Sequence, residues 1–252
     1  MMQSSEGGMT DKPSVFVGMP CYDSVKRETV MALLKLFDKF RSSAIKAQFR
    51  IINSSLVTHG RNMVTCGFLH SNYDYLLFVD ADISFEPEAV LRMLVTKKDV
   101  ICTPYRLKLA DLSIKYPVSF KDAKNIDIEE LGMVNIVEIE AGPAGLMLIH
   151  RKVFEKLMKK HSEYKITIPD NKLREMNDEV MGVPTTEDPI SKYLYNFWDT
   201  SFYLGTGAWK GEDLAFCDLV RGAGFKIHAN IDSETTHHGA YAWRGRFKEA
   251  LR

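Results

Sequence analysis

The sequence has no excess of charge of either sign, no long apolar run and no closely spaced pair of cysteines. Lysine and arginine together number 33, as do aspartate and glutamate, so the formal net charge is zero. A chain-wide basic field that would attract nucleic acid is therefore absent, although a local basic patch stays compatible with this composition. The apolar runs are short, such as residues 76–79, whereas a helix needs about 20 apolar residues to cross a bilayer. We expect no nucleic-acid partner and no transmembrane segment.

The four cysteines are far apart in the sequence and form no Cys-x-x-Cys pair, which argues against zinc ribbons and thioredoxin-like sites. They are Cys21, Cys66, Cys102 and Cys217. Free thiols in a reducing compartment are the simpler interpretation. Residues 1–12 are polar and lack the apolar core of a secretory signal, so we expect a flexible tail there. These features together favour a cytoplasmic protein.

The remaining composition is that of a globular domain. The chain has 252 residues, of which 45% are hydrophobic and 11% aromatic, enough to bury a sizeable core. No internal repeat and no linker rich in proline, glycine or serine divides it. We expect a single domain over residues 13–252, with halves at 13–105 and 106–252.

Strands and helices alternate through the first half of the chain. Short apolar runs predict strands at 14–19, 49–52, 75–79 and 100–102, and helices are expected from about residue 24, over 61–69 and from Pro87. The apolar stripes of the first and third helices are Val30, Leu33, Leu34 and Phe37, and Val90, Leu91, Leu94 and Val95. This alternation is typical of an α/β fold with a mostly parallel central sheet flanked by helices.

The second half has a weaker pattern. It predicts strands at 115–120, 133–139 and 146–149, and helices at 151–160 and 212–220. Residues 165–210 form a long, polar segment of weak periodicity, which is typical of a lid or a binding segment. We expect that segment to shape the pocket of an acceptor substrate.

Three polar clusters follow predicted strands, at 20–23, 53–55 and 80–82. Ligands of α/β sheets bind beyond the carboxyl ends of the strands, where these clusters should meet. Asp80 and Asp82 directly follow a buried strand, and such a pair suits Mg²⁺ or Mn²⁺ held partly by substrate phosphates. Alternatively, these two acids cap the helix that begins at Pro87.

Further candidate residues lie later in the chain or on helices. Glu212 and Asp213 open a predicted helix, a position that the helix dipole favours for acids in any protein. Trp209 precedes them and could stack on a sugar ring. His237 suits Mn²⁺ as a ligand, with a surface histidine as the alternative. Arg61 could bind phosphate or simply be solvated.

Taken in order, these clusters resemble the glycosyltransferases of the GT-A fold, in particular family-2-like enzymes of bacterial, phage or large-virus type. The segments that carry the resemblance are 19–23, 59–62, 75–82 with Pro87, 141–149 with Arg151 and Phe154, 209–213 and 237–239. Each motif is loose, but six in the right order are specific. Together they span residues 14–243.

The resemblance implies metal-dependent transfer of a sugar from a nucleotide-diphosphate donor to a hydroxyl of a glycan, lipid-linked or protein acceptor. It implies that Asp82 and His237, with Asp80, hold Mn²⁺ or Mg²⁺, and His238 is the alternative to His237. Asp213 would be the general base of an inverting reaction, with Glu212 binding the acceptor. The implied donor-binding residues are Pro20, Tyr22, Asp23, Asn53, Arg61, Asp80, Ala81, Asp82 and Tyr105. The implied acceptor or sugar contacts are Gly142, Gly145 and Trp209.

Two other functions are compatible with parts of this pattern. Asp80-x-Asp82-x-Ser84 after an apolar strand superficially matches the haloacid-dehalogenase-like phosphatases, but their nucleophilic strand normally comes first, and Ile83 stands where glycine is usual. A non-catalytic module that binds a sugar or nucleotide is the third possibility. Asn53-Ser54-Ser55 replaces the acidic pair often seen at this place in the family, which leaves the identity of the nucleotide base open.

Overall fold

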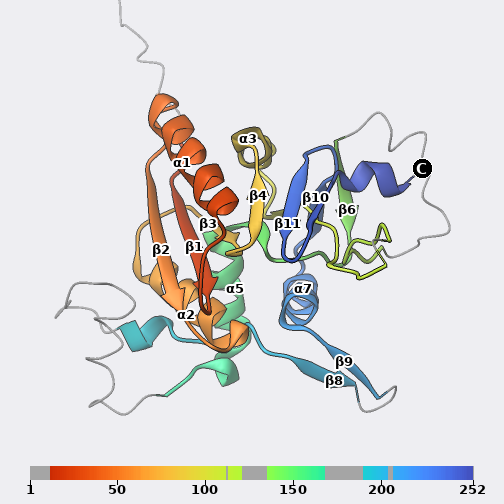
Figure 1. The fold of residues 1–252 in the computed structure, drawn as a ribbon. Coiled ribbons are helices and arrows are strands. Elements are labelled where there is room, and N and C mark those ends of the chain that lie inside the picture. Colours follow the sequence, from red (N-terminus) through yellow and green to blue (C-terminus); the bar gives the residue numbers. More distant parts are fainter. Residues whose placement is uncertain (1–11, 112, 121–134, 168–189, 204–206, 252) are drawn as a thin grey trace, which may run out of the picture.

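The computed structural model describes residues 12–111, 113–120, 135–167, 190–203 and 207–251, and nearly all of the expected tail lies outside them. A seven-stranded sheet of order β2-β1-β3-β7-β5-β10-β6 forms the centre (Figure 1). All its strands run the same way except β7 and β6. The strands are β1 Val15–Cys21, β2 Ala47–Asn53, β3 Tyr75–Val79, β5 Val100–Cys102, β6 Ile136–Ile139, β7 Leu146–His150 and β10 Ile227–Asn230. The expected α/β architecture with a mostly parallel sheet is confirmed.

Helices cover both faces of this sheet because its strands alternate their side chains between two apolar cores. Val15, Val17 and Leu77 belong to the core under α1 (Arg27–Ser42) and α3 (Pro87–Val95). Phe16 and Leu76 belong to the core under α2 (Val57–His70), α5 (Arg151–Lys160) and α7 (Glu212–Gly222). The central strands are therefore apolar along their whole length, as the sequence shows.

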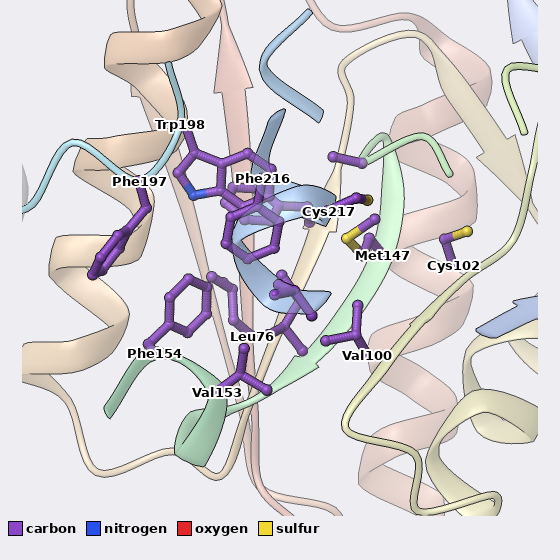
Figure 2. Packing of buried hydrophobic residues seen from close by; sticks show 14 of the residues in the cluster. Leu76, Val100, Cys102, Met147, Val153, Phe154, Phe197, Trp198, Phe216 and Cys217 are labelled. Carbon is purple, nitrogen blue, oxygen red and sulfur yellow. The ribbon is translucent and has the colours of Figure 1, made fainter. Parts of the chain in front are cut away.

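Aromatic side chains fill the second core (Figure 2). Trp198 is fully buried and stacks on Phe216 of α7, with 3.9 Å between ring centroids. Asn62 of α2 accepts a hydrogen bond from the Trp198 backbone amide (3.0 Å), and the indole Nε1 donates to Thr65 Oγ1 (2.9 Å). Trp198 thereby joins α2 to α7 and positions the start of α7.

A three-stranded sheet of order β12-β11-β4 stands beside the central one. It combines β4 (Ile83–Phe85), directly after the Asp80–Asp82 turn, with β11 (Thr235–His238) and β12 (Ala242–Gly245). In Figure 1, β4 and β11 lie side by side, and their register pairs His237 with Ile83. This pairing brings the last part of the chain to the end of β3.

The other elements lie at the periphery. The β8 (Ser201–Tyr203) and β9 (Ala208–Lys210) strands form a hairpin that projects below α7 in Figure 1. Short 3₁₀ turns are η2 Ser162–Tyr164, η3 Ile190–Tyr193 and η4 Phe247–Leu251. Among the helices within the described ranges, none combines the length and the apolar character needed to cross a bilayer.

Some expectations about secondary structure and packing are wrong. Residues 115–120 form no strand, because only Ser119 makes a bridge, to Ala141. Val95 was expected in the buried stripe of α3 but is 80% exposed at the end of that helix. In α1, Leu34 is 56% exposed, so the buried face of this helix differs from the predicted one. The face of α1 that packs on the sheet is instead Thr29, Ala32, Leu33, Leu36 and Phe40. Strands β4, β8, β9, β10, β11 and β12 were not predicted from the sequence.

Candidate active site at the carboxyl ends of the central strands

The three polar clusters that follow β1, β2 and β3 meet at one edge of the sheet, as the parallel order requires. The Ser54 amide donates to the Cys21 carbonyl and the Lys26 amide to the Ala81 carbonyl, both at 2.9 Å. The Asp80 amide donates to the Gly145 carbonyl of the loop before β7, also at 2.9 Å. Backbone hydrogen bonds thus hold these loops together before any ligand binds.

Arg61 lies beneath this edge as a buried cation shared by two acids. Its side chain is only 3% exposed, and Nη2 donates to both Asp80 oxygens, at 3.0 and 3.2 Å. Nε donates to Glu212 Oε1 at 3.2 Å. Burial acts to lower the pKa of Arg61, but the two carboxylates raise it above its usual value. Arg61 therefore stays charged and links the end of β3 to the start of α7.

Gly145 and Tyr105 form the wall beside Asp80. A Cβ at Gly145 would lie 2.5 Å from Asp80 Oδ2 and 2.7 Å from the Tyr105 hydroxyl, so only glycine fits there. Burial, followed by the neighbouring charges of Asp82 and Glu212, raises the pKa of Asp80 even though Arg61 opposes this. The pKa of Asp80 is thus raised mainly by its burial and secondarily by the neighbouring acids.

Asp82 faces a different set of partners from Asp80. Its Oδ2 lies 3.4 Å from His237 Nε2 of β11 and is in direct contact with the ammonium group of Lys108. Partial burial acts to raise the pKa of Asp82, but hydrogen bonds from His237 and Lys108 lower it to about 2. Residues 155 positions apart in the sequence are thus neighbours, as the resemblance implied.

His238 points to the other side of its strand, because successive side chains of a strand alternate. Its Nε2 lies 2.7 Å from Ser84 Oγ, while its backbone amide donates to the Asp82 carbonyl at 2.8 Å. Burial lowers the pKa of His238 below its usual value. The structure places His237, rather than His238, against the Asp82 carboxylate.

The chemistry of the Asp82–His237 pair fits a divalent cation. His237 Nδ1 lies 2.9 Å from the Arg106 carbonyl, which only accepts, so Nδ1 carries a proton and Nε2, the nitrogen that faces Asp82, is the one that a metal would bind. Two ligands of one cation, each about 2 Å from it, can be 3.4 Å apart. No group of three or more acidic, histidine or cysteine side chains within the described residues is arranged to hold a metal. A cation here would therefore have Asp82 and His237 as ligands and take the others from substrate and water.

The first turn of α7 carries the two acids expected to meet the acceptor. Glu212 is held by Arg61, while Asp213 Oδ1 accepts from the Leu214 amide at 2.8 Å. Burial raises the pKa of Asp213, and the charge of Glu212 adds to that effect. A carboxylate with a raised pKa is a better proton acceptor than a free one near neutral pH.

Other candidate residues lie around this centre or away from it. Tyr22 is 73% exposed just past β1, and Asp23 and Asn53 are exposed at the same edge. Pro20 is buried in β1, where a Cβ at Gly60 of α2 would touch it at 3.0 Å. These residues lie at the carboxyl ends of β1 and β2.

Two of the residues implied as acceptor contacts are not in this cluster. Gly142 is buried, and a Cβ there would meet Cys102 Sγ at 2.6 Å, so it belongs to the apolar core. Trp209 is 72% exposed on the β8–β9 hairpin, immediately before α7. All four cysteines are free and buried, which confirms the expectation of free thiols.

Sequence reasoning missed Lys108 as a part of this site, and it did not foresee the contacts of Arg106 and Gly239. Lys108 and Arg106 lie in an irregular segment without periodicity, so no pattern predicts their contacts. Gly239 was included in the His237-x-Gly239 motif, but its role depends on a side chain that passes over it. The folded chain brings Lys108 to Asp82 and Arg106 to His237.

Comparisons with known proteins were made by sequence and by structure. No family model and no curated protein matches the sequence. Among solved structures, A197 from STIV is similar over 90% of this chain and 86% of that chain, with 19% identity and a TM-score of 0.46. The 4-diphosphocytidyl-2C-methyl-D-erythritol synthase of Anaerococcus prevotii DSM 20548 is similar over 67% and 86%, with 10% identity and a TM-score of 0.33.

A third solved structure is a glycosyltransferase involved in the glycosylation of the major capsid of PBCV-1. It is similar over 67% of this chain and 74% of that chain, with 12% identity and a TM-score of 0.29. At identities this low, the function of the present chain has to be argued from the residues of its own site.

Proposed function

We propose that this protein is a glycosyltransferase of the GT-A fold that moves a sugar from a nucleotide-diphosphate donor to an acceptor hydroxyl, with Mn²⁺ or Mg²⁺ as cofactor. The observation that carries the proposal is the approach of Asp82 to His237, 3.4 Å apart, at the carboxyl end of β3. Asp80 lies near Asp82, and Glu212 and Asp213 lie near Asp80. Four carboxylates against Arg61 and Lys108 leave the site with excess negative charge, which a divalent cation would balance.

The donor half of the reaction would use the edge formed by β1, β2 and β3. Asp82 and His237 would hold the cation, which when bound acts as a Lewis acid for the departing diphosphate. Asp80, fixed by Arg61 on both oxygens, would accept a hydrogen bond from the ribose or a metal-bound water. Tyr22 and Asn53 would border the nucleotide base at the open strand ends.

The acceptor half would use the start of α7. Asp213, with its raised pKa, would take the proton of the acceptor hydroxyl as that oxygen attacks the sugar carbon. Glu212, already held by Arg61, would orient the acceptor through its second oxygen. One base on the acceptor side corresponds to inversion at the sugar carbon. The acceptor itself, whether glycan, lipid-linked or protein, is left to experiment.

The phosphatase alternative has no support in this geometry. It would make Asp80 the nucleophile, and a buried arginine holds both Asp80 oxygens. A charge-assisted contact of Arg61 Nη2 with both oxygens lowers the reactivity of the Asp80 carboxylate towards phosphorus. The non-catalytic module remains distinguishable by experiment, because it would bind the donor without turning it over.

A thermal-shift screen of nucleotide sugars with and without Mn²⁺ tests the proposal. A donor present at 100 times its Kd should raise the Tm by about 5–10 °C, because it stabilises only the folded state. The shift should need Mn²⁺ and should disappear in Asp82→Ala. The matched control is Asp38→Ala, since Asp38 is 73% exposed on α1 and remote from the site in sequence.

The outcomes separate the candidate functions. Donor-specific shifts followed by release of nucleoside diphosphate in the presence of acceptor support a glycosyltransferase. Release of phosphate from simple phosphomonoesters would contradict this assignment and indicate a phosphatase. Mn²⁺-dependent binding without turnover, across many donors and acceptors, would indicate a non-catalytic binding module.

A further inference from the structure

The segment 106–109 is attached to the β11–β12 hairpin by contacts that have no role in the central core. The Arg106 carbonyl lies 2.9 Å from His237 Nδ1, and Arg106 Nη1 donates to the Arg244 carbonyl at 3.2 Å. Trp243 Nε1 donates to the Leu109 carbonyl at 3.2 Å. These bonds fix the backbone on both sides of Lys108.

The Lys108 side chain runs over Gly239 to reach Asp82. A Cβ at Gly239 would lie 3.2 Å from Lys108 Cδ and 3.4 Å from its Cε, and 2.9 Å from the Trp243 ring. Because Gly239 has no side chain, there is space above it for the aliphatic part of Lys108. Its ammonium group ends on Asp82 Oδ2, the same oxygen that faces His237 Nε2. Lys108 is 31% exposed, so its end is accessible from solvent.

An ammonium group and a divalent cation should bind Asp82 Oδ2 competitively, because both are positive and both need its lone pairs. Lysine is a compact point charge on a flexible stem and is also a good ligand for phosphate. A metal bound to Asp82 and to the donor would release the ammonium beside the diphosphate.

We propose that Lys108 is a displaceable cation: it holds Asp82 in the free protein and binds the diphosphate of the donor once a divalent cation takes that carboxylate. This inference rests on the proposed function and adds a residue to it. It makes Lys108 a competitor of the metal before the donor binds and a partner of the metal afterwards.

The first test measures the affinity of the protein for Mn²⁺ alone, by calorimetric titration of the wild type, Lys108→Met and Lys115→Met. Methionine keeps the length of the stem over Gly239 and removes the charge. Lys108→Met should bind Mn²⁺ about fivefold more tightly, because its competitor is gone. Lys115 is an exposed residue next to this segment, and its carbonyl accepts from the Leu107 amide, so Lys115→Met should match the wild type.

The second test measures binding of UDP, GDP, CDP, ADP and dTDP at saturating Mn²⁺. The nucleotide that binds the wild type best should bind Lys108→Met about tenfold more weakly, because a charged hydrogen bond to phosphate is lost. Loss of folding could weaken the binding of both Mn²⁺ and nucleotide, but it could not strengthen the binding of one and weaken that of the other. Opposite changes for metal and nucleotide therefore support the proposal.

Failure of this inference is distinguishable from failure of the proposed function. If the wild type binds Mn²⁺ through Asp82 but Lys108→Met binds it equally or less tightly, the role of Lys108 is refuted and the metal site stands. Unchanged nucleotide binding by Lys108→Met refutes the diphosphate contact in the same way. If no Mn²⁺ binds the wild type or Lys108→Met, both proposals fall together.

Discussion

Asp213 has two properties that a general base requires, a position in the first turn of α7 and a pKa raised by burial and by Glu212. Its hydrogen bond with the Leu214 amide holds one oxygen and leaves the other for a substrate. Asparagine can accept the same backbone hydrogen bond but cannot take a proton. Asp213→Asn is therefore a close structural match without the proposed chemistry.

We expect Asp213→Asn to bind donor normally and to slow transfer by about 10²–10⁴-fold, the range of general-base catalysis. In the wild type, kcat should rise with pH through the raised pKa of Asp213, because only the ionised carboxylate accepts a proton. The variant should lose that rise. The measurement is kcat against pH for both proteins, and an unchanged rate in the variant would exclude Asp213 as the base.

Asp213→Asn, which should slow the reaction, should also make the folded protein more stable near neutral pH. A carboxyl group whose pKa is raised on folding costs stability at pH values above that pKa, and the cost vanishes at low pH where the group is protonated in both states. Asp213→Asn should thus melt up to a few degrees higher than the wild type at pH 7, and the difference should shrink towards pH 4. Asp38→Asn, on an exposed residue, provides the control.

At the scale of elements, the close approach of α2 to β1 determines where the Arg61 side chain begins. Gly18 of β1 faces Val64 of α2, and a Cβ at Gly18 would lie 2.1 Å from Val64 Cγ1. Val64 is 1% exposed and, being β-branched, has few alternative rotamers. The helix can only move away from the strand, and Arg61 lies one turn before Val64 on that helix.

We expect Gly18→Ala to destabilise the protein by about 1–3 kcal/mol, because it overpacks the contact between α2 and β1. Val64→Ala alone should also destabilise by leaving a cavity. The double variant should lose less than the sum of the two, since the new methyl group occupies the vacated space. Urea denaturation of the wild type, the two single variants and the double variant measures these free energies of unfolding. Strictly additive losses of stability would contradict this packing.

At the scale of the whole molecule, the two halves expected from the sequence share one sheet. β7 of the second half lies between β3 and β5 of the first, and β10 pairs with β5 on its other side. The active-site groups follow the same pattern, since Asp80 and Asp82 come from one half and Glu212 and His237 from the other. Neither half carries the candidate site alone.

Sequence reasoning could predict the elements whose own residues decide their structure. β3, β5 and α5 were predicted with their bounds or within one residue, because apolar runs and helical spacing are local signals. β4 and β11 could not be predicted, because each is short and partly polar and becomes a strand only by pairing with the other. The contact of His237 with Asp82 followed from the family resemblance, whereas Lys108 needed the three-dimensional path of an irregular segment.

The last prediction concerns Arg61, which contacts Asp80 and also Glu212, a residue 151 positions away from Arg61 in the sequence. Arg61→Met should lower the free energy of unfolding by about 3 kcal/mol at pH 7, because two partly buried carboxylates lose their cation. Arg61→Lys, which keeps the charge but not the forked geometry, should lose less.

The sign of the pH dependence distinguishes this role from simple packing. Without Arg61, the pKa of Asp80 should rise still further above its usual value. The folded variant then binds more protons than the folded wild type, so lowering the pH from 8 to 5 should narrow the stability gap between them. Urea denaturation at both pH values measures the gap. A gap that stayed constant would mean that Arg61 supports the fold through its contacts with Phe78 and Trp198 rather than by its charge.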